Sequence, residues 1–348
     1  MNGPCLILRH DKAGDAIKSL PALRALRSRV PDLDLHLLVS AHNSSLFDFE
    51  PGLTIHRLPP HWEGLKPEVL LSHLVQQGMP RAFYRVVSLL CDAFETTDAL
   101  LSLFPATEKF AAAVKSKERA GDVTLIPLPE NTPAGRDERE NVAWILSQAF
   151  CVDIPNVTLP HSGAPILSAE DSREALTLMG PKKGLWIGFC PFAGLKNRSH
   201  PLSSWESFLR QASRTPFVEK IFLFGTAADC PALEALQSQS YDPKQVQLCF
   251  PSSFRALGSY LQRLDGVVAV DSGPLHLARA LEIPALGILS GGDVKRWFAD
   301  LGEKERILRR GLFNRFPMGW EMTWAFRRWL ADLGPGAPQG LPIFAAND

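Results

Sequence analysis

Short apolar runs of strand length alternate with helix-length segments along most of the chain. In the C-terminal half the runs are apolar throughout, which is typical of strands buried on both faces. They lie at 185–192, 220–225, 246–250, 266–270 and 284–289. Amphipathic segments separate them, and strands that alternate with helices of this length predict a parallel sheet wrapped by helices.

The N-terminal half repeats this pattern more loosely. Strand-like runs lie at 4–9, 33–39, 54–58 and 84–90, and helical periodicity covers 14–29 and 140–150. Residues 91–136 give no clear pattern. Prolines without helical period follow residue 151, so we place a domain boundary near residue 162.

Length and composition fit this division. A chain of 348 residues is more than one hydrophobic core usually serves. The formal net charge of +0 argues against a broad nucleic-acid-binding surface. No apolar run approaches the roughly 20 residues of a membrane span, and the N-terminus lacks the features of a signal peptide. None of the six cysteines forms a CxxC pair, so we expect a cytoplasmic protein.

Residues 267–281 (VVAVDSGPLHLARAL) have the pattern of an anion site. A buried strand ends at Val270, and a helix begins near Gly273 and Pro274. Glycine lets a phosphate approach the backbone, and the free N–H groups of a helix start attract anions. Asp271 and Ser272 either bind ligand hydroxyls or cap the helix. His276 either reaches a phosphate or packs under the turn.

Two further strand ends carry polar loops. After the run at 185–192, a loop of small residues leads to cationic side chains that suit a diphosphate: Ala193, Gly194, Lys196 and Arg198. The alternative is an ordinary solvated loop. After the run at 220–225, Thr226 and Asp229 precede a helix. Asp229 either accepts from ribose hydroxyls or caps that helix.

The common nucleotide and metal motifs are absent from the sequence. No GxGxxG follows the first strand, and no GxxxxGK[ST] or HExxH occurs. We therefore expect no metal and no cofactor.

Asp15 follows the first apolar run, in the first turn of the helix predicted from Gly14. The helix dipole favours a charged carboxylate there, so Asp15 is either a structural cap or a general base. Lys12 and Gly14 lie beside it, and glycine permits close approach of a sugar.

Three stretches together resemble the ADP-heptose:lipopolysaccharide heptosyltransferases of glycosyltransferase family 9. Residues 14–26 (GDAIKSLPALRAL) look like that family's N-terminal signature, and 270–281 (VDSGPLHLARAL) like its D-[ST]-G-x-x-H-L signature. SHPLSSW, at 199–205, lies where the family has a K-x-W-P segment. The resemblance covers roughly residues 4–312.

The resemblance implies an α/β protein with the GT-B fold, in which two Rossmann-like doubly wound domains face each other across a cleft. Residues 1–162 would bind the acceptor and 163–312 the nucleotide sugar. Residues 313–348 would form a helix and tail that pack back on the N-terminal domain. Residues 60–136 match no motif, although they should contain much of the acceptor surface.

The implied reaction is inverting, metal-independent transfer of a heptose from ADP-heptose to a lipid-linked or core oligosaccharide acceptor of lipopolysaccharide. Asp15 matches the catalytic carboxylate. Arg198 falls where the family has a lysine that meets the diphosphate, with Lys196 as the alternative, and Asp229 falls near the ribose-binding acid. The residues that match the donor-phosphate turn are Asp271, Ser272, Gly273 and His276.

Two other functions remain open on the same fold: a nucleotide-sugar 2-epimerase and a non-catalytic sugar-nucleotide-binding protein. The segment 319–333 (GWEMTWAFRRWLADL) also has two interpretations. Its tryptophans and arginines suit a peripheral contact with the inner membrane, and its apolar period suits a packing helix.

Overall fold

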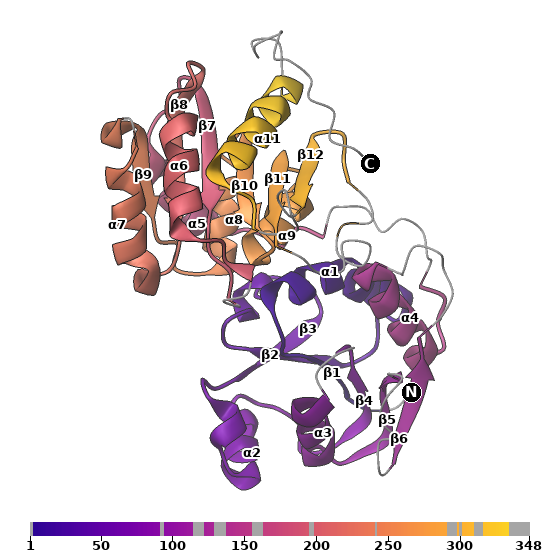
Figure 1. Cartoon of the computed structure of the whole chain (residues 1–348). Helices are drawn as coiled ribbons and strands as arrows, with labels where there is room; N and C mark the ends of the chain where they lie inside the picture. The colour runs from indigo at the N-terminus through magenta and orange to yellow at the C-terminus, as the bar shows by residue number, and fades with distance from the viewer. Residues whose placement is uncertain are drawn as a thin grey trace. The chain divides into compact units, whose positions relative to one another are not determined.

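The computed structural model divides the chain into two compact units (Figure 1). The N-terminal unit comprises Met1–Ala169 with two short returning segments, Ser253–Arg255 and Asp293–Ala299, and the C-terminal unit comprises the remainder. The main division at Ala169 lies beyond the predicted boundary at 162. The structure describes residues 3–90, 94–113, 122–128, 137–154, 163–194, 198–240, 242–290, 298, 301–309 and 316–333.

The N-terminal unit is a six-stranded parallel sheet with strand order β3-β2-β1-β4-β5-β6. The strands are β1 (Cys5–Arg9), β2 (Leu35–Ser40), β3 (Leu53–Leu58), β4 (Phe83–Ser88), β5 (Ala106–Ala113) and β6 (Val123–Pro127). The helices are α1 (Ala13–Arg29), α2 (Pro67–Gln76), α3 (Phe94–Leu103) and α4 (Glu138–Phe150), with short 3₁₀ turns at Ser44–Leu46 and Trp62–Gly64. Figure 1 shows α1 and α4 on one side of this sheet and α2 and α3 on the other.

The central strand β1 is buried along its whole length, as its unbroken apolar sequence predicts. Leu6 and Leu8 pack with side chains of α2 and α3 in one core cluster. Parallel pairing places β2 and β4 on either side of β1, with Cys5 opposite both Leu35 and Arg85. The core therefore fixes where β1 ends and where the following turn begins.

The C-terminal unit repeats the same design, with strand order β12-β11-β10-β7-β8-β9 in a second parallel sheet. The strands are β7 (Leu185–Cys190), β8 (Val218–Phe224), β9 (Val246–Cys249), β10 (Gly266–Val270), β11 (Ala285–Leu289) and β12 (Glu305–Arg309). The helices are α5 (Ala169–Met179), α6 (Leu202–Ala212), α7 (Cys230–Ser238), α8 (Phe254–Leu261), α9 (Gly273–Ala280) and α11 (Gly319–Asp332), with 3₁₀ turns at Ala227–Asp229 and Pro243–Gln245.

Helix α11 packs inside the C-terminal unit, beside α6 (Figure 1). Phe326 lies 6.0 Å from the Phe189 ring and 5.4 Å from the Phe208 ring, between centroids. Trp329 is fully buried, and its indole N–H donates to the Lys304 carbonyl at 2.9 Å. The resemblance predicted packing on the N-terminal domain. The aromatic side chains of β7 and α6 instead bury the apolar face of α11.

Both sheets share one topology, because the first strand of each unit is central and the fourth pairs beside it. Such an order has a topological switch point, between β1 and β4 in one sheet and between β7 and β10 in the other. Ligands bind outside the carboxyl ends of the strands at these points. The predicted α/β class with two Rossmann-like sheets is confirmed.

The segment at 91–136 that gave no clear pattern contains α3, β5 and β6. Residues 129–136 of that segment lie outside the described residues, as do 114–121 and 91–93. β5 carries charged side chains: Glu108 pairs with Arg85, and Lys109 lies 3.1 Å from Asp122. A strand toward the sheet edge with paired charges lacks the apolar run by which central strands are recognised.

Candidate active site

Arg9, the last residue of β1, organises the switch point of the N-terminal sheet. Its side chain is fully buried. Nε and Nη2 donate to the backbone carbonyl of Asp15 at 3.2 and 3.0 Å, and Nη1 donates to the Leu89 carbonyl, just after β4, at 2.8 Å. Nη2 also donates to the Glu138 carboxylate at 3.2 Å. One guanidinium therefore connects β1, β4, α4 and the first turn of α1.

Two carboxylates occupy this turn. Asp11 Oδ2 lies 3.3 Å from Arg9 Nη1, with 22% of the Asp11 side chain exposed. Burial raises the pKa of Asp11 to about 7, because the negative charges of Asp15 and Glu138 add to the effect and Arg9 offsets only part of it. The pKa of Asp11 therefore depends in part on the charge of Asp15.

Asp15 is half-buried in the first turn of α1, but it is not the N-cap. Lys12, an exposed residue, holds that position without a side-chain hydrogen bond, and Ala13 and Gly14 form the buried first positions of the helix. The Asp15 carbonyl accepts from Arg9 and from the Ser19 hydroxyl, at 2.8 Å. The backbone of Asp15 is therefore fixed through its carbonyl oxygen, and the residue at the N-cap position of α1 is Lys12.

A second buried ion pair fastens α1 to α4 behind this turn. Lys18 Nζ donates to both carboxylate oxygens of Asp137, at 3.1 and 3.2 Å. Asp137 also caps α4 by accepting from the Arg139 N–H at 2.8 Å. Although burial opposes it, the charges of Lys18 and Arg139 hold the pKa of Asp137 below its usual range.

In the C-terminal sheet, Asp271 and Arg198 join the two strands that flank the switch point. Asp271 follows β10 directly and is 4% exposed. Its Oδ2 lies 3.0 Å from Nη1 of Arg198, which belongs to the loop after β7. Two residues that the sequence placed in separate loops therefore form one ion pair.

Helix α9 begins directly after Asp271, at the turn where the sequence predicts an anion site. Ser272 is the N-cap by position, yet its hydroxyl donates to the Val270 carbonyl at 3.0 Å and makes no capping hydrogen bond. Gly273 and Pro274 begin the helix, both partly exposed. Ser272 therefore caps α9 by position without a side-chain hydrogen bond, and Asp271 pairs with Arg198.

His276 and His200 are both buried near these loops. His276 Nε2 lies 3.8 Å from Asp271 Oδ1, so the imidazole faces the carboxylate from the first turns of α9. His200 donates from Nε2 to the Ile288 carbonyl at 3.1 Å. Burial lowers the pKa of His200, only partly offset by that hydrogen bond.

In the turn after β8, two residues of the turn, Thr226 and Asp229, are hydrogen-bonded to each other. The Asp229 carboxylate accepts from the N–H and the hydroxyl of Thr226, at 2.8 and 2.7 Å. The two residues form a reciprocal capping box in which Thr226 is the N-cap. Asp229 therefore closes the 3₁₀ turn Ala227–Asp229 with its side chain, and it is the N-cap of α7 by position without a side-chain capping hydrogen bond.

The structure describes the loop after β7 up to Gly194 and again from Arg198. The Ala193 N–H donates to the Ser199 hydroxyl at 3.2 Å. Gly194 is exposed, and a Cβ there would meet no atom within 4 Å, so packing does not require glycine at this position. Lys196 lies outside the described residues.

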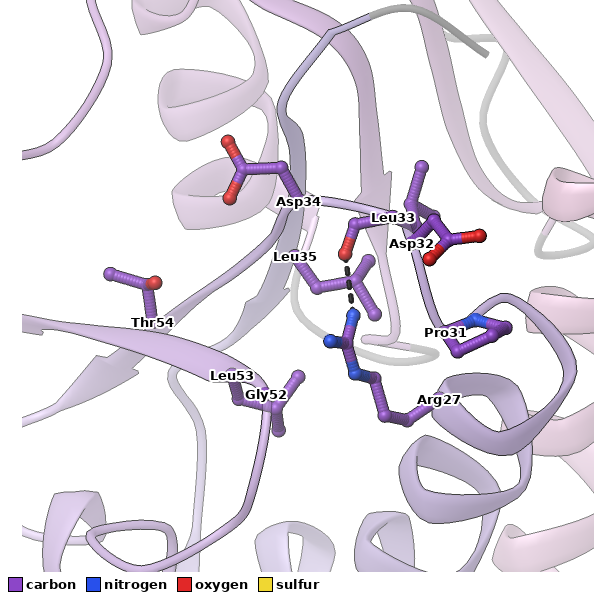
Figure 2. A pocket seen from close by; sticks show the side chains of 9 residues that line it. All are labelled: Arg27, Pro31, Asp32, Leu33, Asp34, Leu35, Gly52, Leu53 and Thr54. Carbon is purple, nitrogen blue, oxygen red and sulfur yellow. Dashed lines mark hydrogen bonds between the residues drawn. The ribbon is translucent and has the colours of Figure 1, made fainter.

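Two surface hollows lie at the opposite, amino-terminal edges of the sheets. One, of about 350 Å³, is lined by the end of α1 and the starts of β2 and β3. The other is lined by residues around the start of β8 and before β9. Figure 2 shows Arg27 reaching across the first hollow to the Leu33 carbonyl, at 2.6 Å. This edge is remote from the strand ends that bind ligands in such folds.

Sequence reasoning missed Arg9, Asp11 and Glu138 as parts of the turn around Asp15. The signal was an arginine at the end of an otherwise apolar run, since a buried charge needs partners. Among the described residues, no group of three or more histidine, cysteine, aspartate or glutamate side chains is placed to hold a metal ion. Within the same residues, every helix is too short or too polar to cross a bilayer.

The comparison with family models gives one match, to glycosyltransferase family 9 (heptosyltransferase), over residues 146–311. That range contains β7, the Arg198 loop, the Asp229 turn and the start of α9. The matched segment, slightly less than half of the chain, is therefore similar to glycosyltransferase family 9. The enzyme class predicted from the sequence, a glycosyltransferase, is confirmed by this match. Asp15 lies outside the matched range.

Solved structures of two heptosyltransferases and of a family 9 glycosyltransferase have a similar fold over most of the chain. The E. coli heptosyltransferase WaaC with ADP-2-deoxy-2-fluoro heptose aligns at a TM-score of 0.69 and 14% identity, covering 95% of this chain and 100% of that one. A family 9 glycosyltransferase from Veillonella parvula aligns at 0.72 and 13% identity, covering 95% and 98%. E. coli ADP-heptose lipopolysaccharide heptosyltransferase II aligns at 0.69 and 16% identity, covering 94% and 98%. A comparison with curated protein sequences gave no match.

Proposed function

We propose that this glycosyltransferase moves a heptose, with inversion, from ADP-heptose to a lipid-linked or core oligosaccharide acceptor of lipopolysaccharide. One observation carries the proposal: each sheet has a polar turn of suitable chemistry at its switch point. The N-terminal turn carries carboxylates, and the C-terminal turn joins a helix start to Arg198. The family 9 match, and the ADP-sugar analogue bound in the WaaC structure, support the choice of donor.

Asp15 is the proposed general base. Transfer with inversion needs a group that takes the proton of the acceptor hydroxyl as that oxygen attacks the anomeric carbon. Asp15 is half-buried at the switch point, and its backbone is fixed through Arg9 and Ser19. A carboxylate on an immobilised helical turn keeps its direction toward a bound hydroxyl, which is the geometric condition for efficient proton transfer.

The start of α9 and Arg198 are the proposed site for the diphosphate of the donor. As the glycosidic bond to the nucleotide breaks, negative charge grows on the leaving ADP. Backbone N–H groups at Gly273 and the guanidinium of Arg198 would stabilise that charge. Asp271, which is buried, holds Arg198 by the 3.0 Å ion pair and thereby orients it. These groups supply positive charge from the protein itself, so we propose turnover without a divalent metal.

The decisive experiment compares Asp15→Asn with Asp11→Asn in the full chain. Arg9 and Ser19 contact the backbone carbonyl of residue 15, which the change to asparagine leaves in place. The melting temperature and the affinity for ADP should therefore stay close to wild type. If Asp15 is the base, kcat should fall about 10²–10⁴-fold. Asp11→Asn is the matched control from the same turn. Near wild-type kcat in Asp15→Asn would refute the assignment, and a loss confined to Asp11→Asn would transfer it to Asp11.

The reaction type is tested separately with ADP-heptose and heptose-deficient lipopolysaccharide. Release of ADP that requires the acceptor supports transfer. Isomerisation of the nucleotide sugar without acceptor would indicate an epimerase, and binding without turnover would indicate a non-catalytic protein. EDTA should leave the rate unchanged, and loss of activity restored by Mg²⁺ would refute metal independence.

A further inference from the structure

The outer face of α11 combines large aromatic and basic side chains. At 3.6 residues per turn, Trp320, Trp324, Arg327 and Arg328 fall within an arc of about 100°. Trp320 is 56% exposed, and Met318, at the N-cap, is 46% exposed. Both arginines are exposed as well. We call this set of five residues the tryptophan–arginine face.

The fold of α11 does not require these side chains. A separate set of residues packs the helix into the C-terminal core: Met322, Phe326, Trp329 and Leu330. Within the described part of the chain, neither Trp320 nor Arg327 makes a hydrogen bond or ion pair. Arg328 lies over the Trp324 ring, 5.6 Å from its centroid. Trp320 is therefore exposed for a reason other than packing, and Trp324 beside it is half-buried.

The face also has a positive charge that nearby acids do not cancel. Glu321 is buried, and its carboxylate accepts from the Met318 N–H at 2.6 Å. Asp332 pairs with Arg306 at 3.1 Å. Neither acid contacts Arg327 or Arg328, so both exposed guanidinium groups keep their charge beside the exposed indole of Trp320 and the half-buried indole of Trp324.

We propose that the tryptophan–arginine face binds the surface of a bilayer that contains anionic lipid headgroups. Indole rings partition at the level of the headgroups, and arginines on the same helix face are attracted to anionic lipid. A helix that buries one face in a folded core and exposes such a second face lies along a membrane surface rather than across it. The inference rests on this surface alone and does not depend on the proposed donor or acceptor.

The face begins close to the loop after β7. Phe316, two residues before Met318, packs its ring against His200 with 5.1 Å between centroids. His200 belongs to the segment that follows Arg198. Binding of α11 to a bilayer would therefore hold the proposed donor loop near the membrane, within one unit of the protein.

The test is co-sedimentation of the full chain with vesicles of phosphatidylcholine alone or mixed with phosphatidylglycerol. We expect binding to the anionic vesicles and weaker binding as salt increases. One basic side chain near an anionic surface changes partitioning about fivefold, so the Arg327→Gln and Arg328→Gln pair should weaken binding about 25-fold. Trp320→Ser should also weaken binding. Phe217→Ser is the matched control, since Phe217 is 54% exposed just before β8.

Three results would overturn the proposal. The first is absence of binding to anionic vesicles. The second is binding that survives the arginine and Trp320 changes, or that Phe217→Ser weakens equally. The third is self-association in sedimentation velocity that Trp320→Ser abolishes, because the face would then be a contact between copies of the chain. Vesicle binding by a protein that fails to use ADP-heptose would refute only the proposed function.

Discussion

Replacing Arg9 by methionine should destabilise the N-terminal unit strongly. The substitution removes the hydrogen bonds to two backbone carbonyls and to Glu138, together with the ion pair to Asp11. Glu138 is 1% exposed, so its carboxylate would stay buried without its cation. Breaking a buried pair in this way costs about 3–5 kcal/mol in the free energy of unfolding.

Arg9→Lys separates charge from geometry. Lysine keeps the positive charge, but its three donors sit on one nitrogen and lack the planar fork with which Nε, Nη1 and Nη2 of Arg9 reach Asp15, Leu89 and Glu138. We expect a loss of about 1–3 kcal/mol, the cost of leaving buried carbonyls unpaired. The double variant Arg9→Met with Glu138→Gln should recover part of the loss of Arg9→Met, because the buried charge is removed along with its partner.

The assay is urea unfolding combined with hydrogen exchange measured by mass spectrometry on peptides from β1 and α1. Exchange localises the effect, since a two-unit chain need not unfold in a single step. Arg29→Met, at the exposed end of α1, is the control and should change stability by less than about 0.5 kcal/mol. A loss below about 1 kcal/mol for Arg9→Met, or no recovery in the double variant, would refute the role given to the buried guanidinium.

Three further outcomes are expected. Gly52→Ala should destabilise the N-terminal unit by about 1–3 kcal/mol in thermal unfolding, because φ is +70° and a Cβ would lie 2.2 Å from Arg27 Nε; an unchanged melting temperature would contradict this. Burial and the neighbouring His36 lower the pKa of His56 to about 4, below its unfolded value near 6.5, so the contribution of neutral His56 to stability should fall as pH drops through 6.5, by about 2 kcal/mol at pH 5; because the raised pKa of Asp11 acts in the opposite direction, the check is the pH dependence of the urea midpoint in wild type against His56→Gln, and equal dependence in the two proteins would exclude it. Arg198→Ala should weaken ADP binding in calorimetry about tenfold or more, and unchanged affinity would remove Arg198 from the donor site.

The central elements were predictable from the sequence because burial on both faces leaves an unbroken apolar run. β1, β7 and β10 follow this rule, and the turns after them were found at the ends of the runs. β5 was not found, because the charges of Glu108 and Lys109 interrupt it, and β6 was not found because it is a short run of five residues. Those charges find partners on a neighbouring strand or beyond it, which a local pattern cannot reveal.

The candidate site was predictable only as separate pieces. Gly273 and Pro274 follow local rules for starting a helix, so the start of α9 was placed correctly. The partner of Asp271 was not, because Arg198 approaches it only through the pairing of β7 with β10. Glu138 likewise reaches Arg9 across 129 residues of sequence. Contacts of this kind depend on strand order, which neither hydrophobic period nor capping signals encode.

The shared strand order also sets a sequence of events during synthesis. In each unit the strand that is synthesised first is central in the sheet, and its second neighbour is synthesised much later. Cys5 of β1 pairs with Arg85, which lies 80 residues further along the chain, and Ile187 of β7 pairs with Gly266, which lies 79 residues further. Non-local pairing of this kind is slow. Arg9 must therefore stay hydrated on the nascent chain until Leu89 and then Glu138 have left the ribosome. The turn that holds Asp15 is translated before its partners Leu89 and Glu138 and is among the last parts of its unit to be fixed.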